Sequence, residues 1–332
     1  MGQRFLTLYS KFFQKFLKSK KPPRLAGQWS RLARPLKVVF DCSNGVAGLV
    51  LKQLKTGEIK TYFINEKPDG NFPAHGPNPL NPGATNQLQA AVKKNKADLG
   101  IIFDADADRM FCIDDKSRFI NPDAIARILA WQLKPKKIII DVSTGWLVKK
   151  LQVTSYKLQV IESKVGHYFI KKMMRAENAD FGAEHSGHYY FKNFFGLDSG
   201  ILAAIEVINA VSELPYKLSD FIELLPKYYH QEINIRYQES GIRNQEIFKK
   251  IEKKYLLLNT KYLIRISHLD GLTMEFENKI GPASRSLGEG WWFNLRFSQT
   301  ESLLRLNIET TEKSKLQKEI SKLKKFLQLA AR

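Results

Sequence analysis

Short apolar runs alternate with amphipathic segments over the first two thirds of the chain. Runs typical of buried strands occur at 37–40, 99–103, 138–141, 159–161 and 180–182. Segments with helical spacing of apolar residues lie at 85–94, after Asn121-Pro122, at 166–174 and from Gly200 to about Val211. Alternating strands and helices are typical of α/β domains with mainly parallel sheets. The pattern therefore predicts two such domains in succession.

The pattern changes after about Leu214. Alternating apolar and polar positions predict antiparallel strands at 262–266, 272–276, 291–297 and 303–308, with helices at 245–255 and from 311 to the end. Runs of strands flanked by helices are typical of an α+β domain. We therefore expect four parts: a basic amphipathic segment at 1–35, α/β domains at 36–133 and 134–222, and an α+β domain at 223–332.

The N-terminal segment carries apolar residues between Phe5 and Leu17 that line one broad face of a helix, which Pro22-Pro23 would end. A surface membrane anchor and an organelle-targeting leader are alternatives to a helix packed on the protein. We favour packing, because a domain starts directly afterwards. No apolar run approaches the ~18–20 residues that span a bilayer.

Charge and cysteine usage narrow the class of protein. The 332 residues carry 53 Lys and Arg against 33 Asp and Glu, a net charge of +20. This excess suits an enzyme with anionic phosphate substrates, and it also suits nucleic-acid or acidic-membrane binding through residues 1–37. Cys42 and Cys112 both lie in or beside strand-like segments, so we expect no disulfide framework and a reducing, cytoplasmic setting.

An acidic loop follows the apolar run at 99–103. Asp104, Asp106 and Asp108 stand at alternate positions, and Arg109 comes next. In a strand or tight loop this spacing directs the carboxylates to one side, where oxygen-only ligands suit a hard cation such as Mg²⁺. A solvated acidic turn is the alternative interpretation.

Three further loops have the composition of ligand sites. The stretch 67–83 is rich in Pro, Gly and Asn, and a long ordered loop is usually functional. The loop 183–188 follows a strand, at the end where parallel sheets bind ligands. The turn 296–305 combines two arginines with hydroxyls, which suits a phosphate, although an ordinary polar hairpin has the same features.

Four of these stretches, in order, resemble the α-D-phosphohexomutases, the phosphomannomutase/phosphoglucomutase family. Asp69-Gly70-Asn71-Phe72-Pro73 through Leu80 is similar to its domain-2 loop, and 104–109 to its metal loop. Glu184-His185-Ser186-Gly187-His188 resembles its sugar-binding loop, and 296–301 its phosphate loop. The resemblance implies domains 2 to 4 of the family and interconversion of hexose 1- and 6-phosphates by Mg²⁺-dependent phosphoryl transfer.

The resemblance also implies roles for individual residues. The metal ligands would be Asp104, Asp106 and Asp108. The catalytic group would comprise His188, Arg109, Lys164 and His167, with His188 as a general acid or base. The substrate-binding residues would be Glu184, Ser186, His188, Arg296, Ser298, Gln299, Thr300 and Arg305. For His188, a packed core position beside Tyr189 and Tyr190 is the alternative.

The departures from the family pattern bear on activity. The family's first domain carries a phosphorylated serine in a Thr-Ala-Ser-His-Asn-Pro loop, and no such segment occurs in these 332 residues. We expect a chain that is inactive alone: half of a split enzyme whose partner chain bears the serine, or a truncated product. A non-catalytic sugar-phosphate-binding or regulatory protein is the alternative. Ala105 and Ala183 replace family glycines, which predicts shifted loops if a positive φ is required there.

Overall fold

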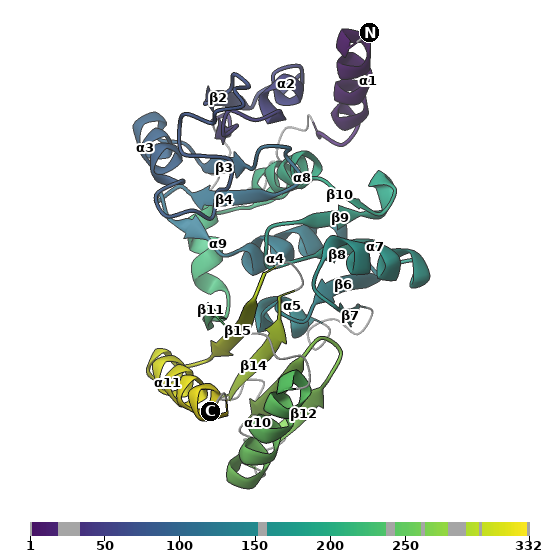
Figure 1. Cartoon of the computed structure of the whole chain (residues 1–332). Helices are drawn as coiled ribbons and strands as arrows, with labels where there is room; N and C mark the ends of the chain where they lie inside the picture. Colours follow the sequence, from purple (N-terminus) through teal and green to yellow (C-terminus); the bar gives the residue numbers. More distant parts are fainter. Residues whose placement is uncertain are drawn as a thin grey trace. The chain divides into compact units, whose positions relative to one another are not determined.

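The computed structural model describes residues 2–18, 34–151, 158–236, 243–259, 263–277, 290–298 and 301–330. The chain packs as two compact units (Figure 1). The N-terminal unit comprises Met1–Ile140, Leu147–Ile161 and Ile170–Leu225, and the C-terminal unit comprises Asp141–Trp146, Glu162–Phe169 and Pro226–Arg332. The four-part division at 35/36, 133/134 and 222/223 stays a prediction.

The first sheet of the N-terminal unit has the strand order β2-β1-β3-β4-β5. Its strands are β1 (Lys37–Asp41), β2 (Lys60–Ile64), β3 (Leu99–Phe103), β4 (Met110–Asp114) and β5 (Phe119–Ile120). β1 pairs in parallel with β2 and β3, whereas β4 and β5 join in antiparallel pairing. Every residue of β3 is buried, as its continuous apolar sequence predicts.

Three helices accompany this sheet: α2 (Ala47–Leu51), α3 (Asn86–Asn95) and α4 (Pro122–Leu133). Leu88 and Val92 of α3 pack with Val39 and Ile102 of the sheet. α4 begins where the sequence predicts, because the Asn121 side chain accepts a hydrogen bond from a backbone N–H and proline occupies the first turn.

The second sheet has the order β10-β9-β8-β6-β7. Its strands are β6 (Lys137–Asp141), β7 (Gln159–Ser163), β8 (Phe181–Ala183), β9 (Tyr189–Phe191) and β10 (Leu197–Asp198). β6 and β8 are parallel, and β9 and β10 extend the sheet by antiparallel pairing. Both sheets are thus mixed, with parallel strands at their centres, and the predicted fold class is confirmed.

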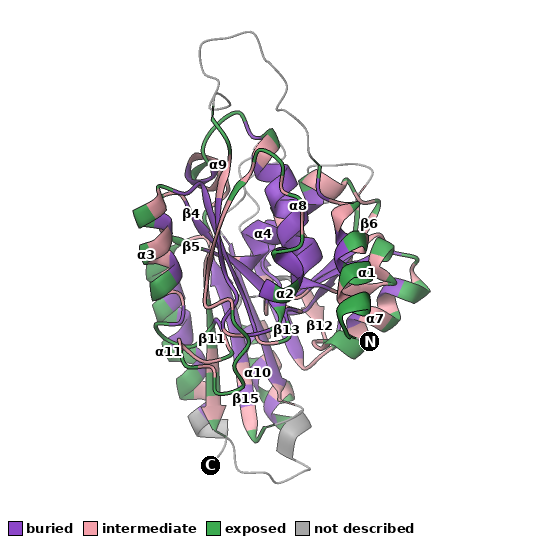
Figure 2. Cartoon of the chain, turned by 90° about the horizontal axis from the view of Figure 1, so that it is seen from above, coloured by how far each residue is buried: buried purple, intermediate pink, exposed green. Residues whose placement is uncertain are grey.

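The helices that follow β6 are α5 (Trp146–Lys149), α7 (His167–Ala176), the 3₁₀ helix η2 (Lys192–Phe194), α8 (Gly200–Glu213) and α9 (Leu218–Leu224). Residues Gly200 to Val211 of α8 are all buried, and Figure 2 shows this helix as buried along most of its length. α8 packs on α4. This explains why its sequence is apolar on all sides.

The amphipathic helix predicted at the N-terminus is α1 (Gly2–Gln14). Phe13 is fully buried and contacts Phe194, whereas the Phe5 side chain is 67% exposed. Figure 2 shows exposed residues along much of this helix. None of the described helices is both long and apolar enough to span a membrane.

The C-terminal unit contains an antiparallel sheet of order β11-β15-β14-β13-β12. Its strands are β11 (Tyr229–Arg236), β12 (Leu263–Ser267), β13 (Leu272–Glu277), β14 (Gly290–Phe297) and β15 (Leu303–Thr310), and its helices are α10 (Arg243–Asn259) and α11 (Lys313–Ala330). The helices pack on one face, around Tyr255 and Phe293. β11 was not predicted, because only Ile233 and Ile235 alternate within this otherwise polar edge strand.

Candidate functional site

The three aspartates of the acidic loop converge. One carboxylate oxygen from each of Asp104, Asp106 and Asp108 lies within 4.8 Å of the others. Asp104 is only 3% exposed and Asp108 is partly buried, whereas Asp106 is exposed. Arg109 fixes Asp104 twice, through its Nε at 2.6 Å and its backbone N–H at 3.1 Å.

The donor set of this loop fits a hard divalent cation. One arginine offsets one of the three carboxylate charges, which leaves a net charge equal and opposite to that of Mg²⁺. Asp108 Oδ1 is buried, and its charged neighbours are His188 Nε2 at 3.5 Å and Arg109 Nε at 4.0 Å. Carboxylate oxygens on a short loop are typical magnesium ligands.

The pKa values of Asp104 and Asp108 are shifted in opposite directions. Burial raises the pKa of Asp104, and the hydrogen bond from Arg109 offsets only part of this effect. Burial acts in the same direction on Asp108, but the nearby His188 outweighs it and lowers the pKa of Asp108. The pKa values of these two carboxyl groups are therefore shifted in opposite directions. A bound divalent cation would favour the ionised form of both groups.

The acidic loop and the loop 184–188 are joined through their backbones. Arg109 and His188 form an isolated antiparallel bridge, and the Met110 N–H donates to the Gly187 carbonyl at 3.1 Å. Gly187 has φ +90°, and a Cβ there would meet the Phe111 ring at 2.6 Å. Glycine is therefore required for this close approach.

His188 lies between carboxylates. Its Nε2 is 3.5 Å from Asp108 Oδ1, and its Nδ1 is 2.8 Å from Ser186 Oγ and 3.4 Å from Glu184 Oε2. Burial alone would lower the pKa of His188, but these acidic neighbours raise it overall. Buried Glu184 also accepts a hydrogen bond from Tyr190 Oη at 2.5 Å. His188 thus faces the acidic loop and is not a packed core residue.

The alanines at family glycine positions do not strain either loop. Neither Ala105 nor Ala183 has a positive φ, so the predicted shift of the loops is not required. Ala107 has φ 61° instead, and its carbonyl accepts the Gly200 N–H at 3.0 Å. A Cβ on Gly200 would lie 2.8 Å from that carbonyl oxygen. The N-terminus of α8 therefore supports the acidic loop.

The Pro- and Gly-rich loop at 67–83 packs beside the acidic loop. His75 Nε2 lies 3.1 Å from Asp41 Oδ2, and this hydrogen bond raises the pKa of His75. Asn78 Oδ1 lies 3.5 Å from a guanidinium nitrogen of Arg109. The loop is thus anchored at the carboxyl end of β1 and also borders the arginine of the acidic loop.

In the C-terminal unit, Arg296 and Arg305 stand directly opposite each other on β14 and β15. Arg305 pairs with Glu301 at 2.6 Å and Glu232 at 3.6 Å. Arg296 is only 6% exposed, and no described carboxylate pairs with it. Its Nε is buried and has no hydrogen-bond partner in the part of the chain that the structure describes.

The remaining predicted residues of this unit are Ser298, Gln299, Thr300, Lys164 and His167, and His167 is the first residue of α7. The Ser298 N–H donates to the Leu303 carbonyl at 2.8 Å, which closes the turn after β14. Gln299 and Thr300 lie outside the described residues. Lys164 and His167 are exposed, and the Lys164 amine lies 5.7 Å from the centre of the Phe169 ring.

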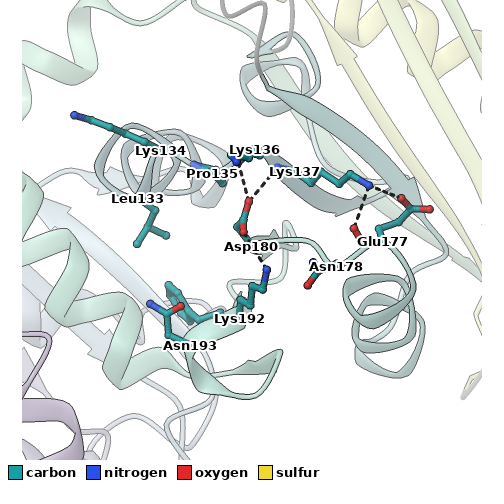
Figure 3. Close-up of a pocket in the computed structure, with 11 residues that line it drawn as sticks. Leu133, Lys134, Pro135, Lys136, Lys137, Glu177, Asn178, Asp180, Lys192 and Asn193 are labelled. Carbon is teal, nitrogen blue, oxygen red and sulfur yellow. Dashed lines mark hydrogen bonds and ion pairs between the residues drawn. The ribbon is translucent and has the colours of Figure 1, made fainter.

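A cavity of about 600 Å³ opens elsewhere in the N-terminal unit, and none of the predicted site residues lines it (Figure 3). It lies at the amino ends of β6 and β8, and four lysines line it. Lys137 reaches Glu177 at 2.9 Å and Lys192 reaches Asp180 at 3.6 Å. These contacts neutralise part of the positive charge.

Sequence reasoning missed some groups around His188. Asp198, on β10, joins Asp108 and His188 in a second set of potential ligand atoms within 4.8 Å, and it also pairs with Lys171 at 2.9 Å. The sequence feature that could have indicated Asp198 is its position just before the helix predicted from Gly200. The contact between Gly200 and Ala107 had no local signal, because those residues are far apart in the sequence.

Comparisons with known proteins agree with the motifs. Residues 13–117 match the family "Phosphoglucomutase/phosphomannomutase, alpha/beta/alpha domain II", and residues 121–228 match its domain III. The chain is 33% identical over 297 residues to a phosphomannomutase of Methanocaldococcus jannaschii, covering 88% of this chain and 61% of that protein. It is 35% identical over 296 residues to a phosphomannomutase of Vibrio cholerae, covering 84% and 58%. The chain thus spans about three fifths of the length of these relatives.

Solved structures share the fold. A phosphoglucomutase/phosphomannomutase family protein from Burkholderia thailandensis aligns with a TM-score of 0.77 at 23% identity, over 98% of this chain and 64% of that one. An N-acetylphosphoglucosamine mutase from Aspergillus fumigatus, solved with GlcNAc-6P and magnesium, aligns with a TM-score of 0.60 at 13% identity, over 97% and 65%.

Proposed function

Because the chain belongs to the phosphoglucomutase/phosphomannomutase family, we propose that it binds a hexose phosphate with Mg²⁺ and forms the larger part of a phosphohexomutase. The observation that carries the proposal is the bridge between Arg109 and His188, which joins the acidic loop to the sugar-binding loop. A metal-binding group and a proton-transfer group thereby share one small region of the N-terminal unit.

In this proposal Asp104, Asp106 and Asp108 hold the cation. When bound, Mg²⁺ offsets negative charge on a transferring phosphoryl group. Arg109 keeps Asp104 in place and presents its remaining guanidinium N–H groups to the phosphate. Of the three carboxylates, that of Asp104 is held most firmly, by the Arg109 Nε and backbone N–H.

The sugar-binding loop supplies the proton-transfer step. His188 exchanges a proton with the sugar hydroxyl that gains or loses the phosphoryl group, and Ser186 orients the imidazole through Nδ1. Glu184 and Ser186 bind sugar hydroxyls. In the C-terminal unit, Arg296, Ser298, Gln299, Thr300 and Arg305 bind the non-reacting phosphate, and Lys164 and His167 face the ligand.

The family's reaction needs a phosphoserine, which these 332 residues do not supply in the family's Thr-Ala-Ser-His-Asn-Pro form. We therefore propose that these 332 residues bind substrate, and that isomerisation also needs a phosphoserine loop that they do not contain. The buried free thiols of Cys42 and Cys112 support a reducing, cytoplasmic setting.

The test uses the purified chain with Mg²⁺, glucose 1-phosphate and a hexose bisphosphate activator. We expect saturable binding by titration calorimetry and no formation of the 6-phosphate. Clear conversion would contradict the proposed need for an external serine. A folded chain that binds no hexose phosphate would contradict the function itself. Turnover on adding a polypeptide that carries the serine loop would favour a split enzyme over a regulatory binding protein.

A further inference from the structure

Lys164 and His167 lie on the stretch 162–169, which begins with the last two residues of β7 and belongs to the C-terminal unit. One end of this stretch is held by an ion pair between Glu162 and Arg265 of β12. The two candidate ligand-binding residues therefore belong to the same unit as the arginines of β14 and β15. The orientation of Lys164 and His167 depends on the contacts that hold the middle of this stretch.

The turn between β12 and β13 holds that middle part. The backbone N–H of Val165 donates to Asp270 Oδ2 at 3.0 Å. The carbonyl oxygen of Asp270 in turn accepts a hydrogen bond from Asn294 Nδ2 at 2.9 Å. Asn294 precedes Arg296 by two positions on β14, so their side chains lie on the same face of the sheet. Asp270 thus links the stretch to the strand that carries the buried arginine.

Gly271, the next residue, brings the β12–β13 turn close to the backbone of β14. Gly271 has φ +76°, and a Cβ there would lie 2.1 Å from the Leu295 carbonyl oxygen and 2.8 Å from Arg296 Cα. Only glycine permits so close an approach of the turn to β14. The position of Asp270 is therefore set directly against the backbone at Arg296.

We propose that Asp270 is a positioning residue that holds the Lys164–His167 segment in register with Arg296, so that Lys164 and Arg296 act on one bound hexose phosphate. The inference rests on the proposed function. Asp270 does not contact the ligand in this account; a single side-chain oxygen accepts the Val165 N–H. The effect should therefore depend on the acceptor oxygen and on the presence of the Lys164 amine.

The experiment measures glucose 1-phosphate binding by titration calorimetry, with the full chain and Mg²⁺. We expect D270A to weaken binding about tenfold, and K164A by a similar factor. D270N keeps an acceptor oxygen and should bind within about twofold of the wild type. The double variant K164A/D270A should bind no more weakly than K164A, because no amine remains to be positioned.

S267A is the matched control. Ser267 lies at the end of β12 next to the same turn, and its Oγ accepts only the Leu269 N–H at 3.3 Å in the described structure. This variant should bind like the wild type. Three outcomes would overturn the positioning role. The first is wild-type affinity in D270A, and the second is an equal loss of affinity in D270A and D270N. The third is a double variant whose loss of affinity equals the product of the two single losses.

A second measurement separates this inference from the proposed function. Amide hydrogen exchange at Val165 should be slow in the wild type and in D270N, and fast in D270A, with no ligand present. Unchanged exchange in D270A would overturn the inference. Failure of the folded wild type to bind any hexose phosphate would overturn the proposed function instead.

Discussion

The acidic loop of the N-terminal unit and the β14–β15 arginines of the C-terminal unit accommodate charge in different ways. Asp104 has Arg109 as a partner, and His188 stands beside Asp108, so the acidic loop is largely held by its own contacts. Arg296 is buried with no described carboxylate partner. A buried charge without a partner destabilises a fold unless a ligand pairs with it. Asp104 and Asp108 thus have charged neighbours among the described residues, whereas we expect the Arg296 guanidinium to pair with an anionic ligand.

The largest expected effect is a loss of stability in the C-terminal unit, caused by a backbone clash beside Arg296. G271A places a Cβ 2.1 Å from the Leu295 carbonyl at a positive φ, and we expect it to lower the free energy of unfolding by roughly 3 kcal/mol. Denaturant unfolding measures the loss. G70A is the control, because a Cβ on Gly70 meets nothing within 4 Å. Equal stability of G271A and G70A would show that the turn does not contact β14.

The second prediction concerns the Arg296 charge itself. R296M should weaken hexose phosphate binding about 100-fold, because a charge-assisted contact to the phosphate is lost. Its stability should stay equal or rise, since a buried unpaired charge becomes an apolar side chain. Calorimetry and denaturant unfolding measure the two effects. R236M, an exposed arginine change on β11, should alter neither. A strongly destabilised R296M would mean that a protein group neutralises the guanidinium.

The third prediction tests the acidic loop. Mg²⁺ at ten times its Kd should stabilise the wild-type chain by about 1.4 kcal/mol, and D106N should lose most of this gain. Asp106 is exposed, so its substitution leaves packing intact. Thermal unfolding with and without Mg²⁺ measures the effect. E58Q removes one exposed acidic charge elsewhere and should keep the full stabilisation. Equal responses of D106N and E58Q would argue against a cation site in the loop.

The smallest expected effect is a pH-dependent loss of stability at His75, which anchors the loop 67–83 to Asp41. The hydrogen bond to Asp41 raises the pKa of folded His75, so its contribution to stability is complete below the unfolded pKa of about 6.5 and is lost as pH rises through the folded value. H75Q should therefore be less stable than the wild type by up to about 1 kcal/mol at pH 6, and the difference should shrink toward pH 8. Unfolding measured across this range checks it. A constant difference would contradict the linkage to His75.

Local patterns predicted the elements that depend on local chemistry. The start of α4 at Asn121-Pro122 and the buried strand at 99–103 follow from capping and from a continuous apolar run. The edge strand β11 was not predicted, because an exposed edge strand needs few alternating apolar residues. The class of two α/β sheets followed by an antiparallel sheet was confirmed, because it depends on the order of elements rather than on their exact ends.

The candidate site was predicted only as far as each loop carries its own signal. The convergence of Asp104, Asp106 and Asp108 follows from their spacing. The contacts that hold the loops, such as Gly200 against Ala107, join residues distant in the sequence, and no single stretch encodes them. The resemblance to a family supplied the order of the motifs, whereas the supporting contacts required the folded chain.

The distribution of tryptophan has a spectroscopic consequence. Trp146, Trp291 and Trp292 belong to the C-terminal unit and are at most 5% exposed, whereas Trp131 on α4 is 45% exposed. Three of the four tryptophans among the described residues lie in that unit, so their fluorescence will report mostly on its environment, while far-ultraviolet circular dichroism averages over every helix. If the two units melt separately, the two optical signals will give different denaturation curves without any added dye.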